Sequence, residues 1–316
     1  MKTMKWLVKR ELWEHKGMLV WTPVVVAGMI AALALLAIFL GKQVQFSGEA
    51  AAAQSLTVSI HGQARASLVD TLAQGYIVAA VPVYMVLGFL VFFYCLGALN
   101  DERRDRSILF WKSLPVSDRT TVLSKAFTAL VVAPLIVVGI ALALSLVLLL
   151  AVVIKLSLHG TVLFGDLLAT PELYLAPLRV LGLLPVYVLW ALPTVGWLLM
   201  ISSMVRSKVF VWAVGLPLGA ALLMVWGQKM LGFDLNVGWF ISNITNRVLL
   251  GVVPGSWVWF DGRTLVLSEE HGLPTAASAF MYSWSTLGNV GLWIGVAAGI
   301  AMIAVAIRMR RRREEG

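Results

Sequence analysis

The sequence predicts an all-α integral membrane protein with six transmembrane helices. Of its 316 residues, 60% are hydrophobic and only 13% are charged, whereas a soluble domain averages about 25% charged residues. Six runs contain no Asp, Glu, Lys, Arg or His, and each has close to the roughly 20 residues that a helix needs to cross the hydrocarbon. We take residues 1–316 as a single transmembrane domain. Its six uncharged runs are residues 18–40, 76–99, 127–154, 180–204, 209–227 and 288–307.

The segment before the first span, residues 1–17, predicts an interfacial helix. One helical stripe is apolar but is interrupted by Glu11 and His15, and Trp6 and Trp13 lie on the far side. Such a helix places lysines toward lipid phosphates and tryptophans at headgroup depth. A positively charged tail without order is the alternative. The first span itself has 23 apolar residues, more than the roughly 7–15 of a cleavable signal, so we expect an anchor that is retained.

The distribution of charge predicts the topology. With six spans both termini fall on one side, and that side carries 18 of the 25 lysines and arginines, while the acids divide equally. Short basic loops remain in the cytoplasm, so we expect cytoplasmic N- and C-termini. The net charge of +9 therefore reports topology. No basic stretch is interleaved with aromatics as a nucleic-acid groove reader requires, so we expect no nucleic-acid partner.

The largest external loop, residues 228–287, contains an uncharged stretch at 248–260. It is too short to span a membrane and too apolar to lie in water, which predicts a re-entrant or interface-lying element. The first external loop, residues 41–75, is polar, and the loop 155–179 is short. The single cysteine, Cys95, lies within a span and excludes a disulfide within one chain.

Several spans contain prolines or regularly spaced glycines that affect helix geometry and packing. Prolines inside spans remove a backbone N–H and kink the helix; they are Pro82, Pro134, Pro185, Pro193 and Pro217. Glycines spaced four apart allow two helix backbones to approach closely; they are Gly215, Gly219, Gly291, Gly295 and Gly299. The spacing predicts close helix packing but leaves open whether the partner helix belongs to the same chain or to a second copy.

Several kinds of chemistry are missing from the sequence. The four histidines are far apart and none has metal-ligand spacing, so we expect no metal site and no catalytic site. No G-x-x-x-x-G-K-[ST] motif occurs, so the chain has no phosphate-binding loop for ATP. Carriers driven by protons or ions need ionisable residues at membrane depth, and the six runs contain none. We therefore expect a conformational drive supplied from outside the membrane and an amphiphilic substrate.

Residues 100–119, between the second and third spans, form the densest cluster of charge. Nine charges of both signs surround an apolar group that includes Phe110 and Trp111. Pro115 ends the first helix, and Ser117 is a good N-cap for a second one, with Asp118 favourably placed at its positive end. Paired charges around exposed aromatics are typical of a protein-docking patch. The alternative is a bend whose aromatics lie in the headgroups.

The same segment carries a resemblance to a known family. The pattern E-R-x-x-x-S-[IL]-L-F-W-[KR]-S-L-P-[VT]-S begins at Glu102 and resembles the region between the second and third spans of ABC-2 type permeases. These are membrane subunits of bacterial ATP-binding-cassette exporters, including bacitracin- and lantibiotic-resistance systems. The resemblance extends from Glu102 to Ile136, roughly a tenth of the chain, and no motif elsewhere indicates a substrate.

The resemblance implies a coupling helix in this loop, seated in a cleft of a separate ATPase subunit that binds ATP and magnesium. It also implies two ATPase copies, a second permease copy as homo- or heterodimer, and re-entrant helices before the last span. The implied contact residues are Asp101, Glu102, Arg103, Arg104, Asp105, Arg106, Ser107, Phe110, Trp111, Lys112, Pro115, Ser117 and Asp118, with a secondary contact at Arg206, Ser207 and Lys208.

The leading expectation is thus a non-enzymatic permease subunit in the bacterial inner membrane. It would export an amphiphile such as a peptide antibiotic or a lipid and would bind no cofactor itself. A secondary transporter or channel, and a scaffold or sensor subunit that transports nothing, are the alternatives.

Overall fold

The computed structural model describes residues 2–40, 63–104, 117–234, 236–260 and 276–312, and every regular element in these ranges is helical. The elements are α1 (Lys2–Glu14), η1 (Gly17–Trp21), α2 (Thr22–Leu40), α3 (Gln63–Gly75), η2 (Tyr76–Ala80), α4 (Val81–Gly97), α5 (Asn100–Arg104), α7 (Asp118–Phe127), η3 (Thr128–Val132), α8 (Ala133–Leu158), α9 (Phe164–Ala169), α10 (Glu172–Gly182), α11 (Leu184–Met204), α12 (Val209–Leu231), α13 (Val237–Phe240), η4 (Ile241–Thr245), α14 (Asn246–Leu250), α15 (Trp257–Phe260), α16 (Ala276–Ser285), η5 (Thr286–Gly288) and α17 (Val290–Arg312). Of the predicted contact residues, Asp105, Arg106, Ser107, Phe110, Trp111, Lys112 and Pro115 lie outside the described residues.

Six helical stretches of the described chain are long and apolar enough to cross a membrane, which confirms the predicted number. They are Gly17–Leu40, Arg65–Glu102, Asp118–Leu158, Glu172–Met204, Val209–Leu231 and Val290–Arg311. The second and third contain 38 and 41 residues. At 1.5 Å per residue they measure about 57 and 62 Å, roughly twice the thickness of the hydrocarbon. These two helices therefore continue well beyond it.

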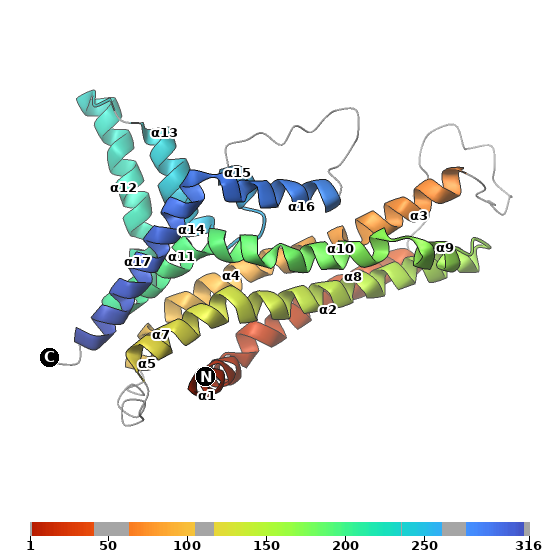
Figure 1. Ribbon diagram of the computed structural model, residues 1–316, viewed down its shortest axis with the longest axis horizontal. Helices are drawn as coiled ribbons and strands as arrows, with labels where there is room; N and C mark the ends of the chain where they lie inside the picture. Colours follow the sequence, from red (N-terminus) through yellow and green to blue (C-terminus); the bar gives the residue numbers. More distant parts are fainter. Residues whose placement is uncertain (1, 41–62, 105–116, 235, 261–275, 313–316) are drawn as a thin grey trace.

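The continuation builds a second, smaller core at one end of the elongated bundle, which we call the distal end (Figure 1). There α3, α9 and α10 pack on η2 and on the last turns of α8, burying Leu163, Leu167 and Ala176. Arg65 Nε on α3 donates to Asp166 Oδ2 on α9 across 2.5 Å. The sequence had suggested a polar loop over residues 41–75 and a short loop over residues 155–179. The helix α3 corrects that expectation for residues 63–75, because its apolar side has other helices to cover it.

The main core is built around α11, which packs along α17 and α4. Trp190, Leu198 and Leu199 of α11 are almost fully buried. A Cβ added at Gly196 would lie 2.5 Å from the carbonyl oxygen of Gly299, so these two backbones approach as closely as glycine allows. Gly299 thus packs within the chain, whereas a Cβ at Gly215 or Gly219 of α12 would meet no described atom within 4 Å.

Prolines shape the helices as the missing N–H requires. A π-helical turn, η3, comes just before Pro134 at the start of α8, and another, η1, precedes Pro23. A 3₁₀ turn, η2, precedes Pro82. Because the proline ring clashes with the carbonyl four residues earlier, a wider or tighter turn relieves the contact. Pro193 and Pro217 instead lie inside α11 and α12.

The chain from α13 to α15 turns back from the far end of α12 toward α11 and α17 (Figure 1). Thr194 Oγ1 on α11 donates to the Arg247 carbonyl across 2.8 Å, and Tyr187 Oη donates to the Val252 carbonyl across 3.1 Å. Gly251 permits this approach, because a Cβ there would lie 2.7 Å from Thr194 Oγ1. The uncharged stretch 248–260 is therefore packed among the long helices without crossing as a span of its own.

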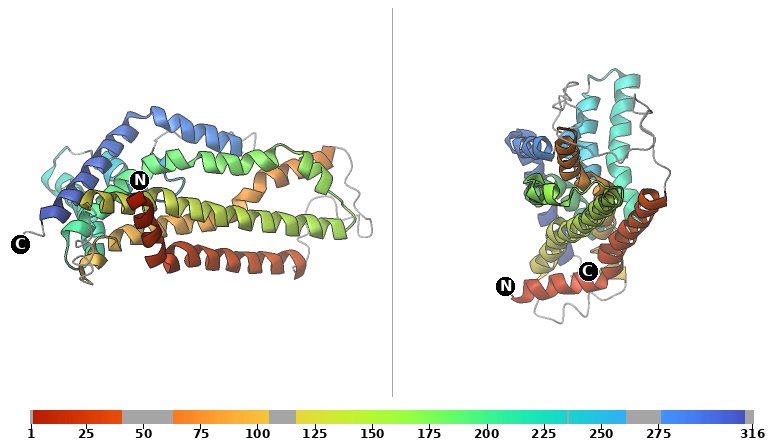
Figure 2. Two further views of the ribbon diagram at one scale, coloured as in Figure 1. Left: turned by 60° about the horizontal axis from the view of Figure 1, so that its bottom comes forward. Right: turned by 90° about the vertical axis from the view of Figure 1, so that its right-hand side faces the viewer.

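Helix α1 begins at Lys2 and lies crosswise to α2 at the end of the bundle opposite the distal end (Figure 2). We call this end the terminal end, because α1, α5, the start of α7 and the end of α17 meet there (Figure 1). Trp6 and Trp13 are 68% and 72% exposed, as an interfacial helix requires. Glu11, which interrupts the apolar stripe in the sequence, is buried against the bundle.

Candidate functional site

Ionisable side chains from elements far apart in the sequence converge at the terminal end. We call them the ion cluster: Arg10 and Glu11 from α1, Glu102 from α5, Asp118 and Lys125 from α7, and Arg310 from α17. Helix α7 begins where Ser117 caps it, since Ser117 Oγ accepts a hydrogen bond from the Thr120 N–H at 3.2 Å. This is the N-cap that the sequence predicted. It places Asp118 in the first turn and Lys125 in the last.

The centre of the ion cluster is the pair Glu11 and Lys125, each only 1% exposed. Lys125 Nζ lies 2.8 Å from Glu11 Oε1 and 3.0 Å from Glu102 Oε1. Tyr94 Oη donates to Glu11 Oε2 across 2.9 Å. A buried pair repays its desolvation only when the remaining lone pairs are also satisfied. These hydrogen bonds meet that condition.

Glu102 joins the ion cluster to the 100–119 segment. Its carboxylate lies 2.8 Å from Arg310 Nη1, 3.0 Å from Lys125 Nζ and 3.3 Å from Arg10 Nη2. Arg310 Nε also donates to Asp118 Oδ1 across 3.1 Å. Glu102 is 7% exposed, so its carboxylate faces the chain's own cations. Any partner bound to this segment would contact Glu102's exposed neighbours, such as Asp101 and Arg104, more directly than Glu102 itself.

Arg10 shows how strongly the ion cluster favours charge. Burial lowers the pKa of Arg10, but its hydrogen bond and charge interaction with Glu14 and the charges of Glu102 and Glu11 outweigh burial and raise that pKa above its usual value. Glu11, Glu14 and His15 also lie within 4.8 Å of one another, a spacing that can suit a metal ion. Here Lys125 and Arg10 bind the two carboxylates instead, so ion pairing accounts for the grouping.

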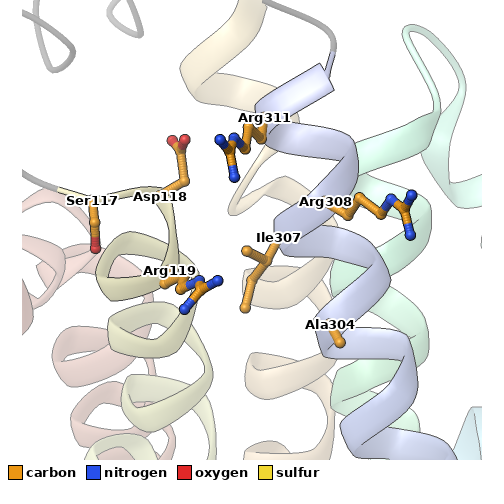
Figure 3. A pocket seen from close by; sticks show the side chains of 7 residues that line it. All are labelled: Ser117, Asp118, Arg119, Ala304, Ile307, Arg308 and Arg311. Atoms are coloured by element: carbon orange, nitrogen blue, oxygen red, sulfur yellow. The ribbon is translucent and has the colours of Figure 1, made fainter.

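A hollow of about 970 Å³ opens beside the ion cluster, between the start of α7 and the end of α17 (Figure 3). It is lined by Ser117, Asp118, Arg119, Ala304, Ile307, Arg308 and Arg311. In Figure 3 the Arg119 side chain extends toward α17, the Arg311 side chain lies on the side of Asp118, and the Arg308 side chain points away from α7. Arginine forks bind carboxylates and phosphates in bidentate geometry. The hollow therefore suits an acidic partner better than a basic one.

The predicted secondary contact lies at the same end. Ser202 Oγ near the end of α11 accepts from the N–H groups of Leu99 and Asn100, at 3.2 and 3.1 Å. The turn of Arg206, Ser207 and Lys208 follows within a few residues and is exposed. Lys208 has a left-handed backbone, with φ of 53°, where α12 begins. The structure thus brings this turn close to the start of the 100–119 segment.

Arg247 was not anticipated from the sequence. It is 7% exposed; its Nη1 donates to the Gly291 carbonyl at 2.5 Å and its Nη2 to the Leu292 carbonyl at 2.9 Å. Its guanidinium lies 4.7 Å from the centre of the Trp190 ring, and burial lowers the pKa of Arg247 to about 10. A Cβ at Gly295 would collide with the guanidinium. The glycine spacing predicted a close neighbour for α17, but nothing in it predicted an arginine.

Searches against family models, curated proteins and solved structures found no match to this chain.

Proposed function

We propose that the chain is the permease subunit of an ATP-binding-cassette exporter in the bacterial inner membrane, driven by a separate ATPase. The observation that carries the proposal is the anchoring of the 100–119 segment. Its first turn is tied through Glu102 to α1, α7 and α17, and its last residues cap and begin α7. A partner that binds this segment therefore pulls on several helices together.

The proposed mechanism transmits movement along two long helices. Asn100 and Glu102 are close to the end of α4, and Asp118 starts the helix that continues through η3 into α8. Closure of the two ATPase subunits on ATP would displace the 100–119 segment. The ion cluster would make α1 and α17 move with that segment, because separating these helices from it would break buried ion pairs.

The sequence shows no energy-coupling motif of its own, and this supports the proposal that a separate ATPase drives the chain. The sequence contains no phosphate-binding loop, and its six apolar runs contain no ionisable residue that could relay protons or ions through the hydrocarbon. An amphiphilic substrate is compatible with uncharged spans, because its transport does not require ionisable residues within the membrane. In this proposal α12 offers a face to a second permease copy, because a Cβ added at Gly215 or Gly219 would meet no described atom of another helix within 4 Å.

The experiment is co-purification from bacterial membranes with a tagged chain. We expect an ATPase subunit to be captured, and we expect Arg119→Glu with Arg311→Glu to reduce its recovery, because the hollow would lose its affinity for acidic groups. The matched control is Lys5→Glu on α1 with Lys16→Glu just beyond it, which makes the same charge change at two other exposed positions. Equal recovery from all three proteins would remove the hollow from the proposal. Absence of any ATPase from the unaltered chain's complexes would reject the permease assignment and favour a carrier, channel or scaffold.

A further inference from the structure

An apolar cavity of about 310 Å³ lies in the bundle among α4, α8, α10, α11, α15, α16 and the turn that precedes α15. Its walls come from separate parts of the chain, including Met85, Val138, Leu184, Val258 and Ala279. Small-molecule sites occupy about 300–1,000 Å³ and are mostly apolar with a few placed polar groups. The cavity has the size and the wall chemistry of a compact ligand site. It shares no lining residue with the hollow at the terminal end.

Two polar side chains of the wall, Tyr187 and Ser283, have hydrogen-bond partners, and a third, Tyr84, has none among the described residues. Tyr187 Oη donates to the Val252 carbonyl. Ser283 Oγ accepts from Trp257 Nε1 at 2.9 Å and donates to the Ala279 carbonyl at 2.7 Å. Tyr84 Oη is buried without a hydrogen-bond partner among the described residues. Leaving a buried hydroxyl unpaired is unfavourable, so a bound molecule that accepts a hydrogen bond from Tyr84 Oη gains that interaction.

The position of the mouth limits what can enter. Val81 and Met85 line the cavity and are each 41% exposed on the outer side of α4. Helix α4 belongs to the second candidate span, Arg65–Glu102, so this side faces the lipid chains when the span lies in a membrane. A charged or sugar-like ligand would have to lose its water to reach the mouth, whereas a hydrocarbon chain already lies there.

We propose that this cavity binds the apolar chain of an amphiphile, alkyl or isoprenyl, with an oxygen of the amphiphile hydrogen-bonded to Tyr84 Oη. The same chemistry belongs to a bilayer lipid and to an amphiphilic cargo. Occupancy also braces the inward-turning chain, because Pro254, Trp257 and Val258 form one wall and a Cβ at Gly88 would lie 3.0 Å from the Val253 side chain. The proposal concerns the cavity alone and stands whether or not an ATPase drives the chain.

The test uses the full chain in lipid nanodiscs and a long-chain fatty alcohol that carries a photoreactive diazirine on its chain. After illumination, labelled peptides are mapped by mass spectrometry. We expect saturable labelling of peptides containing Met85 and Val258, suppressed by unlabelled alcohol. Ala279→Trp fills the cavity and should abolish the saturable part. Ala277→Trp is the matched control, since it makes the same change on the same helix at a residue that does not line the cavity.

Tyr84→Phe keeps the shape and removes only the hydroxyl. It should raise the concentration of alcohol that gives half-maximal labelling by roughly threefold to tenfold, because one hydrogen bond to the ligand is lost. If Tyr84 had only a structural role, that concentration would not change. Competition by phospholipid of the same chain length identifies a bilayer lipid as the occupant, and competition by the alcohol alone identifies another amphiphile. Labelling that is unsaturable, spread over all exposed helices and unchanged by Ala279→Trp would overturn the proposal.

Discussion

The ammonium of Lys125 lies 2.8 Å from Oε1 of Glu11, although 114 positions separate the two residues in the chain. Both side chains are almost completely buried. This one contact fixes the N-terminal helix to the helix that leads into the third candidate span. Removing Lys125 from this pair is expected to lower the stability of the protein.

Lys125→Met should lower the stability of the protein by about 3–5 kcal/mol, because it leaves the carboxylates of Glu11 and Glu102 buried and facing each other. Thermal unfolding of the detergent-solubilised protein measures the loss. Adding Glu11→Gln to Lys125→Met should restore part of the stability. Lys16→Met, at an exposed position just beyond α1, is the control. An unfolding midpoint for Lys125→Met equal to that of the control would contradict the role of the pair.

Variants of the 100–119 segment should separate a structural effect from a docking effect. Glu102→Ala should reduce stability as well as ATPase recovery, since Arg10, Lys125 and Arg310 each lose one of their carboxylate partners. Asp101→Ala, Phe110→Ala and Trp111→Ala should leave membrane abundance unchanged and weaken ATPase binding by tenfold or more, about the cost of truncating an interface anchor. Abundance and co-purification are measured together. Normal recovery and normal transport for all three docking variants would end the coupling hypothesis.

The topology prediction follows from the unequal division of basic residues. Reporter fusions after Glu102 and after Arg311 should read cytoplasmic, and fusions after Ser55 and after Glu269 should read external, because short basic loops are retained in the cytoplasm. Glu102 and Arg310 are ion-paired, so the first two fusions must give the same answer in any topology. An external signal at Glu102 would overturn the orientation.

Arg247 should give the protein an unusual response to alkaline pH. Burial lowers the pKa of Arg247 to about 10 in the folded protein, below the ordinary value in the unfolded chain. The folded state therefore binds this proton less tightly, and the cost of charging is present at every pH below about 10. As pH rises through 10, that cost is relieved. The stability of the unaltered protein relative to Arg247→Met should increase between pH 9 and pH 11, and a constant or falling difference would show that Arg247 is not buried as described.

The energy source gives the last prediction. The purified chain, free of partners, should hydrolyse no ATP, because its sequence holds no phosphate-binding loop. Adding the captured ATPase subunit should restore turnover, and reconstitution into vesicles should couple that turnover to movement of an amphiphile. Nucleotide hydrolysis by a preparation shown by mass spectrometry to contain this chain alone would refute the division of labour.

Local pattern was enough to predict much of the fold. Uncharged runs of sufficient length predicted six long helices, and their number is confirmed. The Ser117 cap and the distortions near Pro82 and Pro134 also follow from properties of a residue and its near neighbours. The long helices, the Ser117 cap and the distorted turns each depend on residues within a few helical turns of one another. Such short-range interactions can be predicted from the sequence.

Tertiary structure alone decided which charges meet. Glu102 and Arg310 stand 208 positions apart, and Arg247 and Gly291 stand 44 apart; no periodicity links either pair. In the sequence, Glu11 interrupts an apolar helical stripe, and Arg247 is one basic residue in a long loop. Burial changes both, because a charge that leaves water must find a partner of opposite sign or a set of hydrogen-bond acceptors. Those partners exist only once the helices have packed, since each is supplied by a segment distant in the chain.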